Sequence, residues 1–319
     1  MPLIASSYNP PLFFKNGHLS TIYAGLLRRV DPPARTRERI FLGDGDFLDL
    51  DWYRGQGTGH KLVLLLHGLE GDATRPYITG SANLLLQNGF HCCALNLRGC
   101  SGEPNRLFRS YHSGATEDLR EVLLHILNTT DYDRIYLKGF SLGGNLVLKY
   151  LGEQPQLPKQ IRAAVAVSVP CDLNSSSKEL HSLENFLYHQ RFKKQLLAKL
   201  RQKQSQFPEL MPEGNFKKIR KLRDFDDIYT SRAHQFRDAL DYYEKCSSLP
   251  LLPQIRVPSL IINARNDSFL GPGCYPWAEA EANPGLFLEV PAFGGHVGFW
   301  GKGNITYSEK RALEFLQSH

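Results

Sequence analysis

Hydrophobic and polar positions divide this chain into short segments that predict strands and helices in alternation. Arg39–Leu42 and Leu48–Tyr53 are typical of an antiparallel pair, because the turn-forming residues Gly43–Asp46 separate them. Leu62–Leu66 is apolar at every position, as expected for a strand buried on both faces. Further strands are predicted at His91–Leu97, Arg134–Lys138, Arg162–Val169, Ser259–Ala264 and Leu286–Val290, and helices at Tyr77–Asn88, Ala115–Leu127, Leu142–Leu151 and Ser308–Gln317.

This alternation is typical of an α/β protein with a mostly parallel, doubly wound sheet, here of about eight strands. The pattern is interrupted once, between Cys171 and about Ser248, by a helical stretch rich in Lys and Gln that contains no convincing strand. We therefore predict a core made of residues 1–171 and 248–319. Residues 172–247 are expected to form a helical cap inserted after a core strand.

Charge narrows the possible partners. The chain of 319 residues has a formal net charge of +6, which is a weak electrostatic footprint for nucleic-acid binding, and no nucleic-acid recognition motif is visible. Residues from Lys178 to Lys245 include fifteen Lys and Arg against ten Asp and Glu. Such a stretch forms either a solvated helical face or a surface that contacts anionic lipid or steers an anionic substrate.

Neither the cysteines nor the first residues indicate a metal site or export. The six cysteines form no CxxC pair and no zinc-like spacing with His, and Cys92 and Cys93 lie in an apolar run that suits buried thiols. Met1–Tyr8 lacks the apolar segment of a secretory leader, and the longest apolar run is far too short to cross a bilayer. We expect a soluble, cytoplasmic monomer or weak dimer without a metal or cofactor.

The strongest chemical signal is Gly139-Phe140-Ser141-Leu142-Gly143, which lies where a predicted strand meets a predicted helix. A nucleophilic serine needs this context, because a sharp strand-to-helix turn exposes its hydroxyl at the top of the sheet. Side chains at Gly139 and Gly143 would collide with neighbouring backbone. We therefore predict Ser141 as a nucleophile, in place of an ordinary serine in a glycine-rich turn.

A second loop, His67-Gly68-Leu69-Glu70-Gly71, directly follows the strand Leu62–Leu66. Such a loop can present a main-chain N–H to the oxyanion that forms when a serine attacks a carbonyl group. We assign the oxyanion hole to the N–H groups of Leu69 and Leu142. Glu70 has no evident role and is expected to be solvated.

A nucleophilic serine needs a base and an orienting carboxylate, which follow in the order Ser, Asp or Glu, His in the hydrolase fold that this motif indicates. Asp267 comes just after the strand Ser259–Ala264, at the sheet edge where α/β folds gather function. His296 follows the last predicted strand, in a loop whose glycines let the chain fold back over the sheet. Asp224, Asp226 and Asp227 are rivals for the acid, but they belong to the cap.

These parts predict a serine hydrolase that cleaves carboxylic esters of small molecules or lipids through an acyl-enzyme. Transfer of the acyl group to an alcohol or thiol shares the first half-reaction and stays open. A binding protein that keeps the fold without catalysis is the third reading.

Seven motifs spread over nearly the whole chain resemble the YheT/EMB8-like family of α/β-hydrolases, which is related to mammalian ABHD1, ABHD2 and ABHD3. They are Asn16-Gly17-His18-Leu19-Ser20-Thr21-Ile22, Asp44 to Trp52, His67 to Gly71, Asn96-Leu97-Arg98-Gly99-Cys100-Ser101-Gly102, Tyr111-His112-Ser113-Gly114 with Asp118, Gly139 to Asn145, and Gly294-Gly295-His296-Val297-Gly298-Phe299. The resemblance implies the α/β-hydrolase fold and hydrolysis of carboxylic or lipid esters without a cofactor. It also supports Ser141, Asp267 and His296.

The chain departs from the family at one place. The family usually has Asp-Asp-Pro-Phe around the acid, and this chain has Asn266-Asp267-Ser268-Phe269, so a rigidifying proline is absent. The block Tyr111–Gly114 is expected to be a structural tie beneath the site. Four aromatic residues of the cap either line an acyl pocket or, as is more common in an amphipathic helix, simply belong to its core: Phe186, Tyr188, Phe192 and Phe207.

Overall fold

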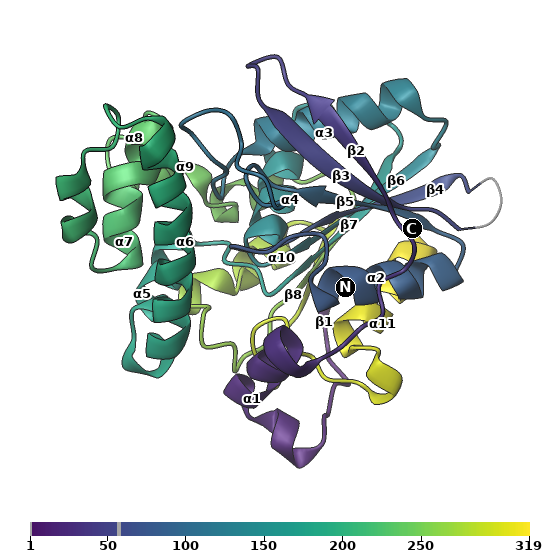
Figure 1. Cartoon of the computed structure of the whole chain (residues 1–319). Helices are drawn as coiled ribbons and strands as arrows, with labels where there is room; N and C mark the ends of the chain where they lie inside the picture. The colour runs from purple at the N-terminus through teal and green to yellow at the C-terminus, as the bar shows by residue number, and fades with distance from the viewer. Residues whose placement is uncertain (1, 56–58) are drawn as a thin grey trace.

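The computed structural model describes residues 2–55 and 59–319, and its centre is a single twisted sheet. Within these residues the sheet has nine strands in the order β1-β9-β8-β7-β6-β4-β5-β3-β2. β2 and β3 pair antiparallel, β3 also runs antiparallel to β5, and the other neighbours are parallel (Figure 1). The α/β fold with a mostly parallel sheet is confirmed.

The predicted strands all form, with ends that differ by up to three residues. The strands are β1 (Leu3–Ile4), β2 (Thr36–Phe41), β3 (Phe47–Tyr53), β4 (Lys61–Leu66), β5 (His91–Asn96), β6 (Arg134–Phe140), β7 (Ile161–Val167), β8 (Ser259–Ile262) and β9 (Leu286–Glu289). The expected number of about eight is one too low. The ninth strand, β1, pairs with β9 through two residues only, and two residues are too few to show a period.

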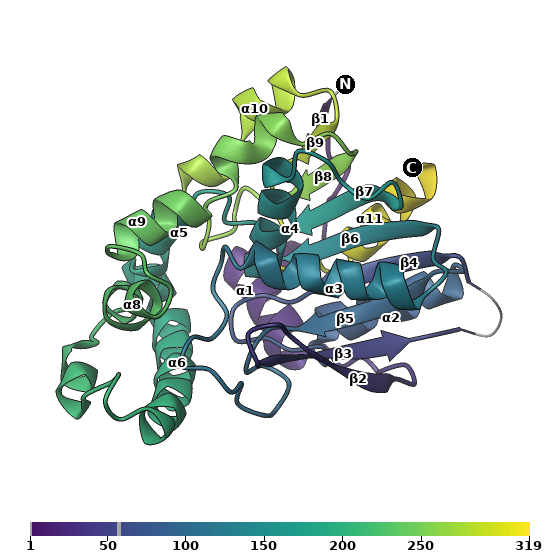
Figure 2. The same cartoon turned by 90° about the horizontal axis from the view of Figure 1, so that it is seen from above.

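Helices cover both faces of the sheet, and each face encloses its own apolar core. α2 (Pro76–Gln87) and α11 (Tyr307–Ser318) pack on one face, and α3 (Thr116–Thr129), α4 (Leu142–Glu153) and α10 (Trp277–Ala282) pack on the other (Figures 1 and 2). The apolar run of β4 contributes alternate residues to the two cores, because successive side chains of a strand point to opposite faces. Cys92 and Cys93 of β5 are buried, as predicted.

Between β7 and β8 the described chain is helical and contains no strand. Its helices are α5 (Leu173–Leu180), α6 (Phe186–Gln206), α7 (Leu222–Phe225), α8 (Ser231–Ala233) and α9 (Ala239–Cys246), with short 3-10 and π turns among them. Figure 2 shows these helices across the carboxyl ends of the parallel strands. The division at residues 172 and 247 into a cap and a core stays a prediction.

An N-terminal helical segment, α1 (Gly17–Ile22) followed by the π turn η2 (Tyr23–Leu27), lies beside the same edge of the sheet (Figure 1). It is fastened by a buried ion pair, in which both Arg28 Nη atoms donate to Glu309 of α11 at 2.8 Å. The ring of Phe14 also stacks on Trp300, with ring centres 5.0 Å apart. None of the helices in residues 2–55 and 59–319 is both long and apolar enough to cross a membrane.

Candidate active site

Ser141 stands on a sharp turn between β6 and α4, with a backbone φ of 52°. The turn requires the two glycines that flank it in the sequence. A Cβ at Gly143 would lie 2.6 Å from the carbonyl oxygens of Leu66 and His67, and a Cβ at Gly139 would collide with the backbone of Gly143. The predicted strand–turn–helix setting and the steric need for both glycines are confirmed.

The structure brings together the three side chains singled out in the sequence. His296 Nε2 lies 3.0 Å from Ser141 Oγ, and His296 Nδ1 lies 2.8 Å from Asp267 Oδ2. The Asp267 carboxylate is buried, and its other oxygen accepts a hydrogen bond from the Phe269 N–H at 3.0 Å. With Nδ1–H donating to Asp267, Nε2 is left as an acceptor for the serine proton. The arrangement can therefore activate a hydroxyl group.

The loop that carries His296 is held by segments far away in the sequence. The His296 N–H donates to Thr21 Oγ1 at 2.8 Å, and the Val297 N–H donates to Ser168 Oγ at 2.9 Å. Gly295 packs so closely on Gly17 that a Cβ there would collide with it. The first of the family motifs is thus a clamp on the histidine loop. Only the family resemblance drew attention to it, and neither periodicity nor spacing indicated its role.

The loop around Asp267 lacks the family's proline and is held by side chains instead. Ser268 donates its hydroxyl to Asn185 Oδ1 at 2.7 Å, and Asn185 Nδ2 donates to the Ser268 carbonyl at 2.6 Å. Asn266 Nδ2 donates to the Lys15 carbonyl at 2.9 Å. Asn185 is fully buried, so this loop is tied into the helical segment between β7 and β8.

The loop after β4 approaches Ser141 from the other side. His67 is fully buried, and burial lowers its pKa to about 4, so the ring is neutral. Because the Leu97 N–H donates to Nε2 at 3.1 Å, Nδ1 carries the proton and donates to the Gly68 carbonyl at 2.8 Å. No described residue accepts a hydrogen bond from the N–H groups of Leu69 and Leu142. Both residues line the same cavity as Ser141.

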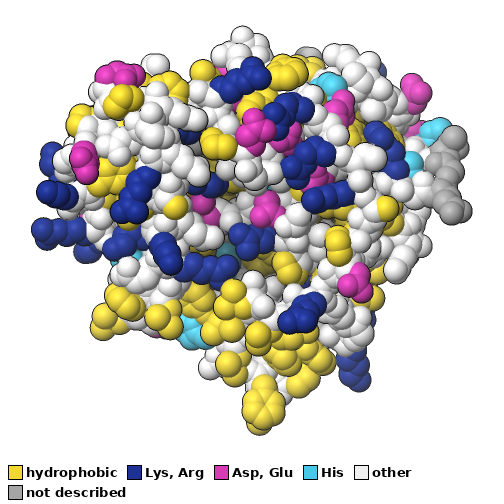
Figure 3. Space-filling model, in the orientation of Figure 1, with side chains coloured by type: hydrophobic (Ala, Val, Ile, Leu, Met, Phe, Trp, Pro, Cys, Tyr) yellow, Lys and Arg dark blue, Asp and Glu magenta, His cyan; other side chains and the backbone are white. Residues whose placement is uncertain are grey.

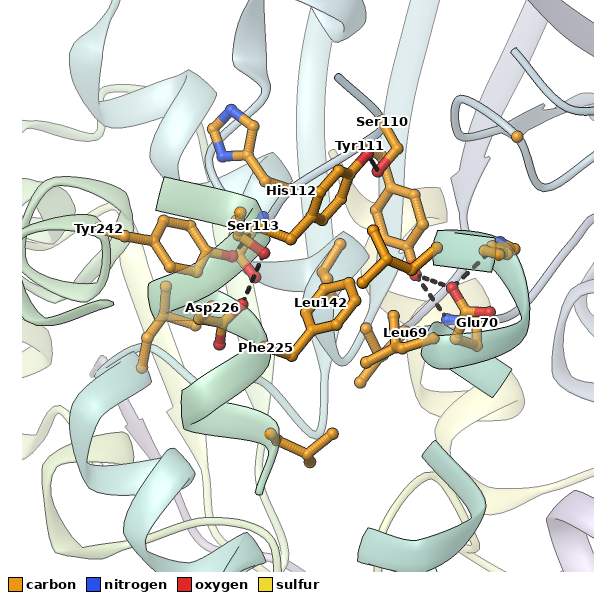
Figure 4. A pocket seen from close by; sticks show the side chains of 18 of the residues that line it. Leu69, Glu70, Ser110, Tyr111, His112, Ser113, Leu142, Phe225, Asp226 and Tyr242 are labelled. Carbon is orange, nitrogen blue, oxygen red and sulfur yellow. Dashed lines mark hydrogen bonds and ion pairs between the residues drawn. The ribbon is translucent and has the colours of Figure 1, made fainter. Parts of the chain in front are cut away.

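Glu70 is not solvated, contrary to expectation. Its side chain is buried, its φ is 53°, and it forms a small polar cluster in the cavity wall (Figure 4). The Glu70 N–H donates to Tyr111 Oη at 2.9 Å, the Tyr111 hydroxyl donates to Glu70 Oε1 at 2.7 Å, and Lys199 Nζ of α6 lies 3.0 Å from the same oxygen. The sequence pattern could not predict this cluster, because Glu70, Tyr111 and Lys199 are far apart in the sequence.

The block Tyr111–Gly114 does more than tie the structure together, since Tyr111 holds the loop that carries Leu69. The rest of the block is a tie. The Ser113 N–H donates to Tyr242 Oη at 2.9 Å, and Asn145 Nδ2 of α4 donates to the Ser113 carbonyl at 2.8 Å. Gly114 packs against Cys246, which leaves no room for a side chain.

Two largely apolar cavities meet at Ser141 and His296. The first extends under α5, α6 and α7, and the second runs between α6 and the N-terminal segment. Of the four aromatic candidates, Tyr188 and Phe192 line the second cavity, whereas Phe186 is mostly exposed and Phe207 packs against Phe108. Phe186 and Phe207 thus line neither of these two cavities, because helical spacing does not specify how α6 is rotated and Phe207 follows the last residue of α6. The first cavity is instead lined by Phe225, Tyr229, Tyr242, Tyr243 and Phe269.

No group of three or more His, Cys, Asp or Glu side chains within the described ranges could hold a metal ion. The acidic rivals make no hydrogen bond to His296, whose described partners are Ser141, Asp267 and Thr21. Asp226 lines the first cavity but accepts hydrogen bonds from Tyr243 and Thr230, and burial raises its pKa to about 6. Asp224 and Asp227 bond to backbone N–H groups of their own segment.

Comparisons with known proteins agree with this fold. Residues 61–303 match the family model described as the alpha/beta hydrolase fold, so the chain belongs to that family. The chain is 35% identical over 302 residues to YheT of Escherichia coli (strain K12), a protein named as an esterase, with 93% of this chain and 88% of YheT covered. It thus belongs to the YheT/EMB8-like group, and the resemblance seen in the motifs is confirmed.

More distant similarities point the same way. Phospholipase ABHD3 of Mus musculus is 27% identical over 329 residues, which cover 99% of this chain and 80% of ABHD3. Among solved structures, the esterase Pf2001 of Pyrococcus furiosus matches with a TM-score of 0.60 at 19% identity, over 89% of this chain and 92% of that one. At this identity the match supports the fold alone.

Proposed function

We propose that this protein is a carboxylic-ester hydrolase that attacks its substrate with Ser141, using His296 as the base and Asp267 as the orienting carboxylate. Its family and its relatives named as esterases support ester hydrolysis as such. The observation that carries the finer proposal is the continuous chain of hydrogen bonds from Asp267 through His296 to Ser141.

The geometry supports a two-step reaction. His296 Nε2 takes the hydroxyl proton as Ser141 Oγ forms a bond to the acyl carbon, and the carbonyl oxygen becomes an oxyanion that the N–H groups of Leu69 and Leu142 stabilise. His296 then gives the proton to the leaving alcohol as the ester bond breaks, which leaves an acyl-enzyme. Water repeats the cycle, releases the carboxylic acid and restores Ser141. Asp267 stabilises the imidazolium form of His296 in both steps.

The apolar lining of the two cavities favours a substrate with at least one hydrocarbon chain. Relatives of this chain are named as phospholipase and monoacylglycerol lipase, which agrees with a lipid-like acyl group. The class proposed is therefore an ester of a medium or longer fatty acid, with short acyl esters as weaker substrates.

The test is hydrolysis of p-nitrophenyl esters from acetate to dodecanoate, together with labelling by a fluorophosphonate. Ser141→Ala is expected to lower kcat by about 10⁴-fold or more and to abolish labelling. Ser205→Ala is the matched control, because Ser205 is exposed on α6 and lines neither cavity. Turnover that survives in Ser141→Ala, or a label on another residue, would contradict the assignment.

A further inference from the structure

Large apolar side chains are exposed on two segments of the surface. Single exposed apolar residues are normal, but a cluster of them marks a place of contact. The exposed fractions range from 47% at Leu19 to 94% at Leu183. We call this set the apolar rim; it consists of Leu12, Phe13, Leu19, Leu26 and Leu27 of the N-terminal segment and Leu183, Phe186 and Leu187 around the start of α6.

The two parts of the apolar rim are neighbours in space. The ring of His18 in α1 stacks on Tyr188 of α6 with centres 5.8 Å apart, and its Nδ1 lies 3.4 Å from Tyr188 Oη. His18 Nε2 also lies 3.9 Å from Glu184. Figure 3 shows apolar side chains gathered along the lower edge of this face, over α1. The rim is therefore one surface built from segments about 170 residues apart.

The N-terminal part of the rim is held firmly in its exposed position. Phe13 projects outward while its neighbour Phe14 stacks on Trp300 with an interplanar angle of 12°. The buried Arg28–Glu309 ion pair anchors the end of the segment. Free energy is gained when an apolar surface held out in this way is covered and removed from water.

Basic side chains follow the apolar ones along the exposed side of α6. Arg191, Lys194 and Arg201 are exposed at spacings of three and seven residues, so they share one side of the helix as Leu187 does. No acidic side chain in the described ranges lies within ion-pair distance of these three. Figure 3 shows Lys and Arg side chains across the face above the apolar edge. An apolar rim followed by basic side chains along α6 is complementary to an anionic lipid surface.

The second cavity opens at the apolar rim and leads to the nucleophile. Leu26 of the rim lines it together with Ile22, Tyr188 and Phe192, and the same cavity is lined by Ser141. An acyl chain that enters at the rim therefore meets a largely apolar lining, which also contains Thr21 and Gln195, before it reaches the reacting atoms.

We propose that the apolar rim docks on the surface of a phospholipid bilayer that contains anionic lipid, with Arg191, Lys194 and Arg201 at the level of the phosphates. Docking places the mouth of the second cavity against the bilayer, so an ester substrate passes from lipid to Ser141 without crossing water. This inference rests on the proposed function for its substrate, whereas the docking itself is independent of catalysis.

The test measures binding by co-sedimentation with vesicles of phosphatidylcholine, alone and with about 30 mol% phosphatidylglycerol, which gives the vesicle a negative surface potential that attracts basic side chains. The double variant Phe13→Ser/Leu187→Ser is expected to lose about tenfold or more in affinity for both vesicles. Lys194→Gln/Arg201→Gln is expected to lose only the preference for anionic vesicles. The matched control is Phe41→Ser/Leu124→Ser, at exposed apolar residues of β2 and α3, outside the rim.

Three outcomes would overturn the proposal: no binding of the wild-type chain to either vesicle, equal losses in the rim and control variants, or a rim that proves to be a dimer interface. The last is tested by light scattering after size exclusion, where a wild-type dimer that Phe13→Ser/Leu187→Ser converts to monomers counts against a lipid partner. Hydrolysis of p-nitrophenyl acetate by the rim variant should match wild type, which shows that the variant is folded. Binding by Ser141→Ala should also match, so a failure of the proposed function stays distinguishable.

Discussion

At the scale of single residues, two non-glycine positions with left-handed backbone shape the candidate site. Ser141 and Glu70 have φ values of 52° and 53°, which cost free energy unless their surroundings hold them. Ser141 is held by the packing of Gly139 and Gly143. Glu70 is held by Tyr111, whose hydroxyl bonds to both its N–H and its carboxylate. Since Leu69 precedes Glu70, Tyr111 positions a proposed oxyanion donor.

Tyr111→Phe is therefore expected to lower kcat about tenfold to hundredfold with little change in KM, because the buried Glu70 N–H loses its acceptor and the Leu69 N–H moves. Kinetics with a p-nitrophenyl ester measure the effect. Tyr132→Phe is the control, because it removes a comparable hydroxyl that bonds to His91 away from Ser141. Equal falls in kcat for the two variants would count against a positioning role.

Lys138 of β6 is a buried cation three residues before Ser141. Its Nζ donates to Ser81 Oγ at 2.9 Å, and burial lowers its pKa from 10.5 to about 8. Between these two values the unfolded chain binds more protons than the folded one, so this residue makes the folded state more stable as the pH rises. Below pH 8 the folded chain carries the full cost of a buried charge.

Lys138→Met is expected to raise the free energy of unfolding at pH 7, because it removes a buried charge that costs about 2–3 kcal/mol. The lost hydrogen bond to Ser81 offsets about 1 kcal/mol of this gain. The advantage over wild type should shrink toward pH 10, where the lysine is largely neutral in the folded chain. Urea unfolding at both pH values measures it, with Lys159→Met at an exposed lysine as the control. An advantage that grows with pH would show that the sign is wrong.

At the scale of elements, α1 acts as a clamp for the loop after β9. Thr21 Oγ1 accepts the N–H of His296 and donates to the Gly17 carbonyl, each at 2.8 Å. Rate depends steeply on how well a base is placed, since displacement by about 1 Å can cost a hundredfold. The N-terminal segment thus influences a loop from which it is separated by 275 residues.

Thr21→Val keeps the shape of the side chain and removes both hydrogen bonds, and is expected to lower kcat about tenfold. Thr21→Ser should restore most of the rate, because it keeps the hydroxyl. Kinetics across pH 5 to 9 and the melting temperature of each variant separate a misplaced base from a loss of folded protein. If valine and serine behave alike, the hydroxyl does not position His296.

At the scale of the whole molecule, the sheet explains which parts of the site could be predicted. Parallel strands end at one edge, so residues that follow β6, β8 and β9 had to meet there. Asp267 and His296 were named on that basis, whereas Ser141 was named from its glycine-flanked motif. Their contact distances agree with this expectation, and their catalytic roles stay a prediction. The contacts of Glu70 and Thr21 were not predicted, because their partners lie 41 and 275 residues away and no local sequence pattern encodes such contacts.

Side chains of the helices between β7 and β8 line the first cavity together with Ser141, so we expect their packing to limit the size of the substrate. Leu180 of α5 lines this cavity and is only partly buried, so a larger side chain can be accommodated there without disturbing the core. Leu180→Trp is expected to lower hydrolysis of the dodecanoate ester about tenfold relative to acetate. Leu180→Ala serves as the control that keeps long esters. A uniform loss across all chain lengths would mean that this cavity does not hold the acyl chain.

The order in which the three side chains occur along the chain has a consequence for synthesis in the cell. A ribosome that has translated as far as β9 has already made Ser141 and Asp267 but not His296. The nascent polypeptide at that stage has the proposed nucleophile without its proposed base. We therefore expect hydrolytic activity to appear only when the loop after β9 has left the ribosomal exit tunnel and has bonded to Thr21 of the N-terminal segment.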